Sequence, residues 1–120
     1  IIDQGGKLCA GGLRHGYIAD NFMNINGCFD YITWFLPFVG EFQHKRWGLP
    51  MKFFKPAEML LHAKECLNDG GSMFIINQGE SEYWLQKQLC EDLGLNYQEI
   101  GLIRSDFYQY RFPRYALIVH

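Results

Sequence analysis

FDYITWFLPFV (29–39), FFKPAEMLLHAKECLNDGG (53–71) and SMFIINQ (72–78) follow one another along the chain, and their order decides the fold. The first and third segments are continuous apolar runs, as is typical of strands buried on both faces of a sheet. The middle segment has apolar residues at the spacing of an amphipathic helix. Two such strands joined by a helix lie parallel, with the helix on one face. We therefore predict a β-α-β unit whose ligands lie at the carboxyl end of the first strand, at residues 34–38.

Proline and glycine mark where the elements of this unit begin and end. Pro37 cannot donate a backbone hydrogen bond to a sheet and should end the first strand, over residues 29–36. Pro56 suits the first position of a helix, and Asn68-Asp69-Gly70-Gly71 should end that helix. The residues between, 40–54, mix charges with aromatic groups and predict a long irregular loop.

Further elements flank the unit on both sides. Residues 15–20 read as a short strand that ends at Asp20. Residues 80–93 predict a second helix, with leucines in one stripe and Trp84 packed on the sheet. Residues 97–103 and 115–119 predict two strands with no room for a helix between them, which favours an antiparallel pair at the sheet edge.

Composition excludes several classes of protein. The 120 residues are 48% hydrophobic and 17% aromatic, which predicts a folded domain with its own core. A net charge of −2 provides no general basic field for nucleic acid or an anionic membrane. No apolar segment reaches the roughly 20 residues that span a bilayer, and the first residues lack the regions of a signal peptide, so we expect a soluble cytoplasmic protein without membrane partners.

The four cysteines form no C-x-x-C pair and the histidines are scattered, so we expect reduced thiols and no metal site.

The order of elements resembles the carboxyl-terminal half of a class I S-adenosylmethionine-dependent methyltransferase. The resemblance rests on the strand that begins Phe29-Asp30, on the leucine-rich helix with its Leu67-Asn68-Asp69-Gly70-Gly71 turn, and on the final antiparallel pair. It implies an α/β Rossmann-like partial domain over residues 15–120, with parallel strands, crossover helices and a terminal antiparallel pair. Residues 1–14 would be a flexible glycine-rich lead-in.

The same resemblance implies a cofactor, S-adenosylmethionine, and positions for it. Asp20 matches the acidic residue that accepts a hydrogen bond from the adenine amino group, and Asn21 and Phe22 would lie beside the ring. The far end of the strand, at Trp34, Phe35 and Leu36, would face the methionine part of the cofactor. The methyl acceptor would contact residues beyond it: Phe38, His44, Lys45, Arg46 and Trp47. Methyl transfer depends largely on alignment and exclusion of water, which aromatic side chains can provide, so no catalytic residue is assigned.

The chain departs from the family in one respect that leaves alternatives open. No glycine-rich cofactor loop precedes Asp20, so we expect a fragment that binds the cofactor poorly, and an exposed strand edge over residues 29–36 through which chains self-associate. One alternative is a non-catalytic Rossmann-like interaction module. Another is a single-stranded nucleic-acid binder that uses the aromatic and arginine residues of 107–115, although the overall acidity argues against it.

Overall fold

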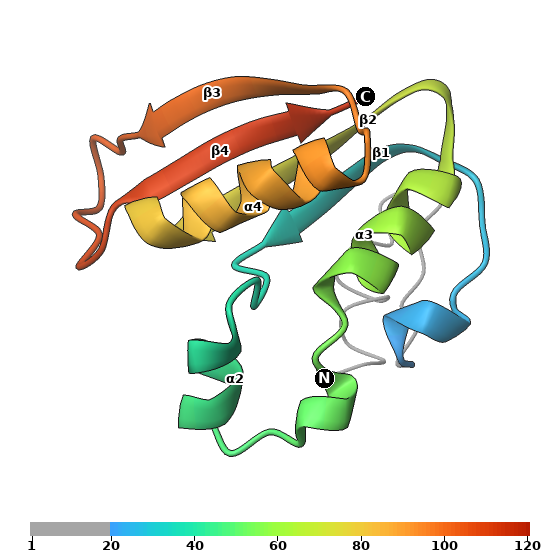
Figure 1. Ribbon diagram of the computed structural model, residues 1–120. Helices are drawn as coiled ribbons and strands as arrows, with labels where there is room; N and C mark the ends of the chain where they lie inside the picture. The colour runs from blue at the N-terminus through green and yellow to red at the C-terminus, as the bar shows by residue number, and fades with distance from the viewer. Residues whose placement is uncertain (1–19) are drawn as a thin grey trace, which may run out of the picture.

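A computed structural model describes residues 20–120, which form a four-stranded mixed sheet with helices packed against it (Figure 1). The strands are β1 (Phe29–Phe35), β2 (Leu67–Gln78), β3 (Tyr97–Ile103) and β4 (Arg114–Val119). The α-helices are α2 (Glu41–Arg46), α3 (Pro56–Glu65) and α4 (Glu80–Asp92), and the short 3-10 helices are η1 (Phe22–Asn24) and η2 (Met51–Phe53).

The sheet has the order β1-β2-β4-β3, with β1 parallel to β2 and β4 antiparallel to both of its neighbours. This arrangement confirms the α/β class, the β-α-β unit and the terminal antiparallel pair. Pro56 stands in the first turn of α3, as predicted. Gly94 follows α4 with φ of +68°, a conformation that glycine adopts without a steric penalty, so it ends the helix as predicted.

One face of the sheet carries the core. α3 and α4 both pack on it, because they contribute apolar side chains at helical spacing that meet alternate residues of β2 and β4 (Figure 1). The Tyr83 hydroxyl of α4 donates a hydrogen bond to the Ala116 carbonyl of β4, 3.1 Å away. The core cluster consists of Leu60, Ala63, Met73, Ile75, Tyr83, Cys90, Leu117 and Val119.

The opposite face of the sheet is apolar but open. Thr33 pairs with Phe74 and Phe35 with Ile76 in the β1–β2 register, so these four side chains share that face. Phe35 is 62% exposed, and Phe74 and Ile76 are half-buried. On this face the described residues leave apolar side chains in contact with solvent.

The structure corrects four predictions. β1 is largely exposed and not buried on both faces, although its outer position in the described sheet agrees with the predicted exposed edge. The segment 40–54 is not irregular, because it contains α2 and η2. Residues 68–71 belong to the start of β2, where the pairing with β1 shifts, and α3 already ends at Glu65. Trp84 points away from the sheet and is 55% exposed, because Tyr83, Gln86 and Cys90 form the inner face of α4.

Two predictions concern residues that lie wholly or partly outside the described range. The lead-in of residues 1–14 is outside it, as is most of the strand predicted over 15–20. Within residues 20–120 no helix has the length and apolar character needed to cross a membrane.

Candidate functional site

The end of β1 is the point where the candidate site begins. Leu36 follows the strand with φ of +54°, a conformation that is uncommon for a residue with a side chain and that concentrates at functional sites. Its N–H donates to the Ile76 carbonyl at 2.8 Å, so the turn is fixed to β2. Leu36 lines three separate cavities, which places it at the centre of the hollow region at the carboxyl end of β1.

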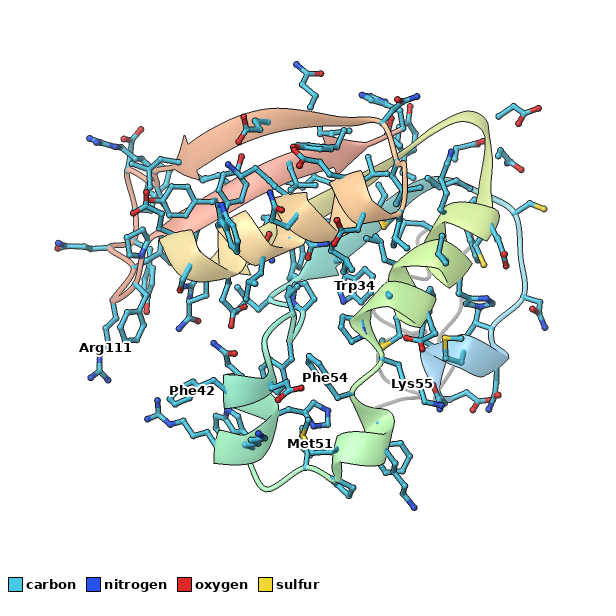
Figure 2. The ribbon with its side chains drawn as sticks, in the orientation of Figure 1. Trp34, Phe42, Met51, Phe54, Lys55 and Arg111 are labelled. Carbon is cyan, nitrogen blue, oxygen red and sulfur yellow. The ribbon has the colours of Figure 1, made fainter. Side chains whose placement is uncertain are left out.

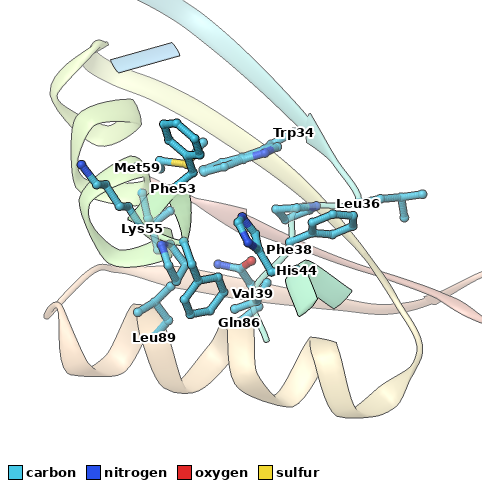
Figure 3. Close-up of a pocket in the computed structure, with 14 residues that line it drawn as sticks. Trp34, Leu36, Phe38, Val39, His44, Phe53, Lys55, Met59, Gln86 and Leu89 are labelled. Atoms are coloured by element: carbon cyan, nitrogen blue, oxygen red, sulfur yellow. The ribbon is translucent and has the colours of Figure 1, made fainter. Parts of the chain in front are cut away.

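The first cavity, here the His44 cavity, has a volume of about 290 Å³ and lies between the end of β1, the start of α3 and the inner face of α4 (Figure 3). Its walls are mainly apolar and aromatic. Figure 2 shows Trp34 and Phe54 turned toward the space between the helices. The residues that line it include Trp34, Leu36, Phe38, His44, Phe54 and Gln86.

His44 is the buried titratable group of this cavity. It is 6% exposed, and its Nδ1 has no hydrogen-bond partner among residues 20–120. The rings of Phe38 and Phe54 meet the imidazole edge to face, with centroids 6.3 Å and 5.5 Å away. A buried imidazole nitrogen without a partner is costly, so a ligand that hydrogen-bonds to it would recover that cost.

Gln86 provides a second polar group that the sequence reasoning missed. It is 2% exposed and its Oε1 accepts a hydrogen bond from Asn77 Nδ2 at 3.3 Å. The Oδ1 of the fully buried Asn77 accepts no hydrogen bond from the part of the chain that the structure describes. Gln86 lies three residues after Tyr83 and four before Cys90, so helical spacing could have placed it on the inner face of α4.

The second cavity, here the Glu82 cavity, has a volume of about 570 Å³ and lies between the end of β1, α2 and the first turn of α4. Glu82 is 6% exposed, and its Oε1 has no hydrogen-bond partner within the described residues. Burial of this carboxyl group raises its pKa from 4.5 to about 6. Four exposed or partly exposed aromatic side chains line the same cavity: Phe38, Phe42, Trp47 and Phe112.

The predicted adenine-binding residues sit apart from these cavities. Asp20 accepts hydrogen bonds from the Asn21 N–H at 2.6 Å and from Asn24 Nδ2 at 3.0 Å, and Asn21 Oδ1 accepts from the Met23 N–H at 3.1 Å. Both side chains therefore stabilise η1. Phe22 is nearer the cavity wall, because its ring centroid is 6.0 Å from that of Trp34.

The predicted residues at the end of β1 and in α2, apart from Lys45, line one or more of three cavities. Trp34, Leu36, Phe38 and His44 line the His44 cavity. Arg46 and Trp47 line the Glu82 cavity, together with Leu36 and Phe38. Phe35 lies on the opposite face of the sheet, in a third cavity with Tyr110 and Arg114.

Lys45 lines none of the three cavities and forms a surface ion pair with Glu41, with Nζ 3.3 Å from the carboxylate. In the described part of the chain no three histidine, cysteine or acidic side chains gather closely enough to hold a metal ion.

The segment between β3 and β4 presents the aromatic and arginine residues in solvent. Phe107 is 99% exposed, and Tyr108 is also exposed. The guanidinium of Arg114 lies 5.0 Å from the Tyr110 ring centroid, and that of Arg111 lies 5.3 Å from the ring centroid of Phe112. Arg111 projects from the tip of this segment (Figure 2). Stacked arginines and free aromatic rings are compatible with base stacking.

Comparison with known proteins gives a partial likeness of fold. No family model matches the sequence, and no curated protein matches it. Among solved structures, wild-type Trm5b from Pyrococcus abyssi is similar with a TM-score of 0.44 and 17% identity. The match covers 81% of this chain and 26% of that chain, so this chain spans about a quarter of that protein. A likeness this distant supports no conclusion about function.

Proposed function

We propose that this chain forms the carboxyl-terminal half of an S-adenosylmethionine-dependent methyltransferase domain. The observation that carries the proposal is the aromatic-walled His44 cavity at the carboxyl end of β1, in a sheet whose last strand is reversed. The resemblance in the order of elements assigns this end of the strand to the methionine part of the cofactor and to the methyl acceptor. Trp34 and Leu36 would contact the cofactor, and Phe38 and His44 would contact the acceptor.

The residues of the cavity suit alignment of the reactants. Trp34 and Phe38 are aromatic walls, and aromatic faces attract cations such as a sulfonium. Leu36 is fixed by its backbone hydrogen bond to β2, so the wall between the two reactants is held in place. The cofactor supplies the methyl group, and His44 Nδ1 would orient an acceptor that can donate a hydrogen bond.

Asp20 and Asn21 already accept hydrogen bonds that stabilise η1, so binding of the adenine ring would have to replace or add to these bonds. Asp20 already accepts two hydrogen bonds, although a carboxylate has room for about four. The cofactor would therefore be held weakly by residues 20–120, and the glycine-rich loop of an amino-terminal half would supply most of its affinity.

Nuclear magnetic resonance tests the proposal with the chain as it is. The three tryptophans each give an indole N–H signal, and S-adenosylhomocysteine is added to millimolar concentration. We expect the Trp34 signal to move with a dissociation constant in the millimolar range, while that of Trp84, which lines none of the three cavities, stays fixed and serves as the internal control. An unmoved Trp34 signal would refute the cofactor site, and a micromolar dissociation constant would refute the need for another half.

A non-catalytic interaction module is the second candidate, and the open apolar face of the sheet favours it. Phe35 and the exposed Tyr31, 81% exposed, present apolar surface that a partner could bury. A partner captured through this face while S-adenosylhomocysteine leaves Trp34 unmoved would support the module. Salt-dependent retention on single-stranded DNA, lost when Phe107 is replaced by alanine, would support the nucleic-acid binder instead.

A further inference from the structure

The Glu82 cavity combines a buried carboxylate with several aromatic faces, and the proposed function assigns no role to Glu82, Phe42 or Phe112. Glu82 lies in the first turn of α4, where carboxylates usually serve the helix end. Among residues 20–120 no side-chain hydrogen bond caps α4, and Glu82 Oε1 has no hydrogen-bond partner. The helix dipole favours the charge of Glu82 by about 1 kcal/mol, which is less than the cost of burying an acceptor without a hydrogen bond.

The aromatic side chains of the cavity are exposed to solvent instead of being packed in the core. Phe42, on the short helix α2, is 68% exposed, and Trp47, the residue after that helix, is 71% exposed. Phe112 reaches the same cavity from the segment before β4. Rings that line a hollow and face solvent present their negative π faces to whatever enters, and such faces attract organic cations.

We propose that the Glu82 cavity binds a methylated ammonium group, with Glu82 as its counter-charge and Phe42, Trp47 and Phe112 as its aromatic walls. The cavity volume of about 570 Å³ leaves ample room for a trimethylammonium group and a short substituent. A quaternary ammonium donates no hydrogen bond, so an aromatic cage with one carboxylate matches it better than a polar cage would. This inference does not rest on the methyltransferase proposal.

Three positive groups oppose such a ligand, and none of them neutralises Glu82. The guanidinium of Arg111 lies 5.3 Å from the ring centroid of Phe112, so it competes for one face of that ring and leaves the other face to a ligand. Arg46 also lines the cavity, but its side chain is exposed, and among residues 20–120 no ion pair joins it to Glu82. The amino end of α4 carries a partial positive charge of about half an elementary charge, less than the full charge of an ionised carboxylate. The charge of Glu82 therefore outweighs the partial charge of the helix end where the two face the cavity, and this part of the cavity favours a cation.

Choline and its neutral isostere 3,3-dimethyl-1-butanol provide the decisive pair of probes. They have the same shape and differ in charge, so their affinity ratio reports the counter-charge and the aromatic faces alone. We expect choline to bind about tenfold more tightly than the neutral alcohol, as measured by Trp47 chemical shifts at pH 8. Equal affinities, or no binding of choline at tens of millimolar, would overturn the proposal.

Matched variants separate Glu82 from general charge effects. Glu82→Gln keeps the shape of the side chain and should reduce the ratio several-fold, leaving only the preference that the aromatic faces provide. Glu80→Gln removes an exposed carboxylate from the same helical turn and should leave the ratio unchanged. Arg46→Gln should raise choline affinity a few-fold. If Glu82→Gln retains the tenfold preference, or if both glutamine variants of α4 lose it equally, the assignment of Glu82 is wrong. The circular dichroism spectrum of each variant checks that it folds.

Discussion

Replacing Glu82 with glutamine should change how the stability of the protein depends on pH. Burial raises the pKa of this carboxyl group from 4.5 to about 6 in the folded state, and the unfolded chain restores the lower value. The folded state therefore binds more protons than the unfolded state between these two values. Stability from this group is fully present below pH 4.5 and is lost as the pH rises through about 6.

The magnitude follows from the difference between the two pKa values. A separation of about 1.5 units corresponds to about 2 kcal/mol, since one unit is worth about 1.4 kcal/mol. Glu82 is 6% exposed but lines a cavity of about 570 Å³, where water can screen its charge, so about 2 kcal/mol is the upper end of the effect. Relative to the glutamine variant, the unchanged protein should thus lose up to about 2 kcal/mol of unfolding free energy between pH 4 and pH 8.

Urea unfolding followed by circular dichroism at several pH values measures this difference. For a protein of this size, 2 kcal/mol corresponds to a shift of the urea midpoint of about 1 M. Glu80→Gln, in the same turn, is the matched control, because a general effect of one charge would move both variants together. A difference between the unchanged protein and Glu82→Gln that stays constant from pH 4 to pH 8, or that grows in the opposite direction, would refute the argument from burial.

Three further predictions concern the sheet edge, the core and the thiols. Tyr31→Lys places a charge on the exposed face of β1 and should shift any concentration-dependent dimer toward monomer in sedimentation velocity; identical sedimentation of both forms at high concentration would argue against association through β1. Leu60→Ala opens a cavity in the core and should cost about 2–5 kcal/mol in urea unfolding, whereas the exposed Leu61→Ala should cost under about 1 kcal/mol. Burial raises the pKa of the Cys90 thiol to about 11, so at pH 8 a disulfide reagent should modify the exposed Cys28 first and Cys90 only on unfolding, as intact-protein mass spectrometry would show; equal rates would contradict its burial.

The helices and strands were predictable wherever apolar spacing and a strong stop signal coincide. α4 illustrates this, because its leucines recur at helical spacing and Gly94 ends it, although Tyr83, Gln86 and Cys90 rather than the leucine stripe form its inner face. β4 was predicted within one residue of its start, since residues 115–119 form a compact apolar run. The start of β2 was predicted wrongly: the strand begins at Leu67, although Gly70 and Gly71 suggested a turn there. The added Cβ of a larger residue at Gly71 would lie 2.9 Å from the backbone carbonyl oxygens of Asn68 and Asp30, so this glycine permits close approach of the strands.

The candidate site was only partly predictable, because its composition depends on which residues of 36–55 turn inward. The sequence identifies Trp34 and Phe38 through their position at a strand end. It gives no sign that α2 buries His44 while leaving Lys45 in solvent, since the helix has one short amphipathic turn. The positive φ of Leu36, which directs the chain away from the sheet, depends on long-range packing and has no local sequence signal.

The error over β1 carries information about the protein. Its sequence is that of a strand with apolar partners on both faces, yet among residues 20–120 it pairs on one side and leaves Tyr31 and Phe35 exposed. Exposed apolar surface at an unpaired strand is an aggregation hazard that natural proteins cover or blunt with charge, and β1 contains only Asp30 as a charged residue. A sequence that keeps such surface is consistent with a strand that is covered when the protein is at work. The amino-terminal half of a Rossmann-like domain would cover the face and pair with the edge at the same time, whereas a second copy of this chain at the edge would leave Phe35 exposed. Burial of Phe35 in an assembly therefore distinguishes completion of a methyltransferase domain from simple self-association.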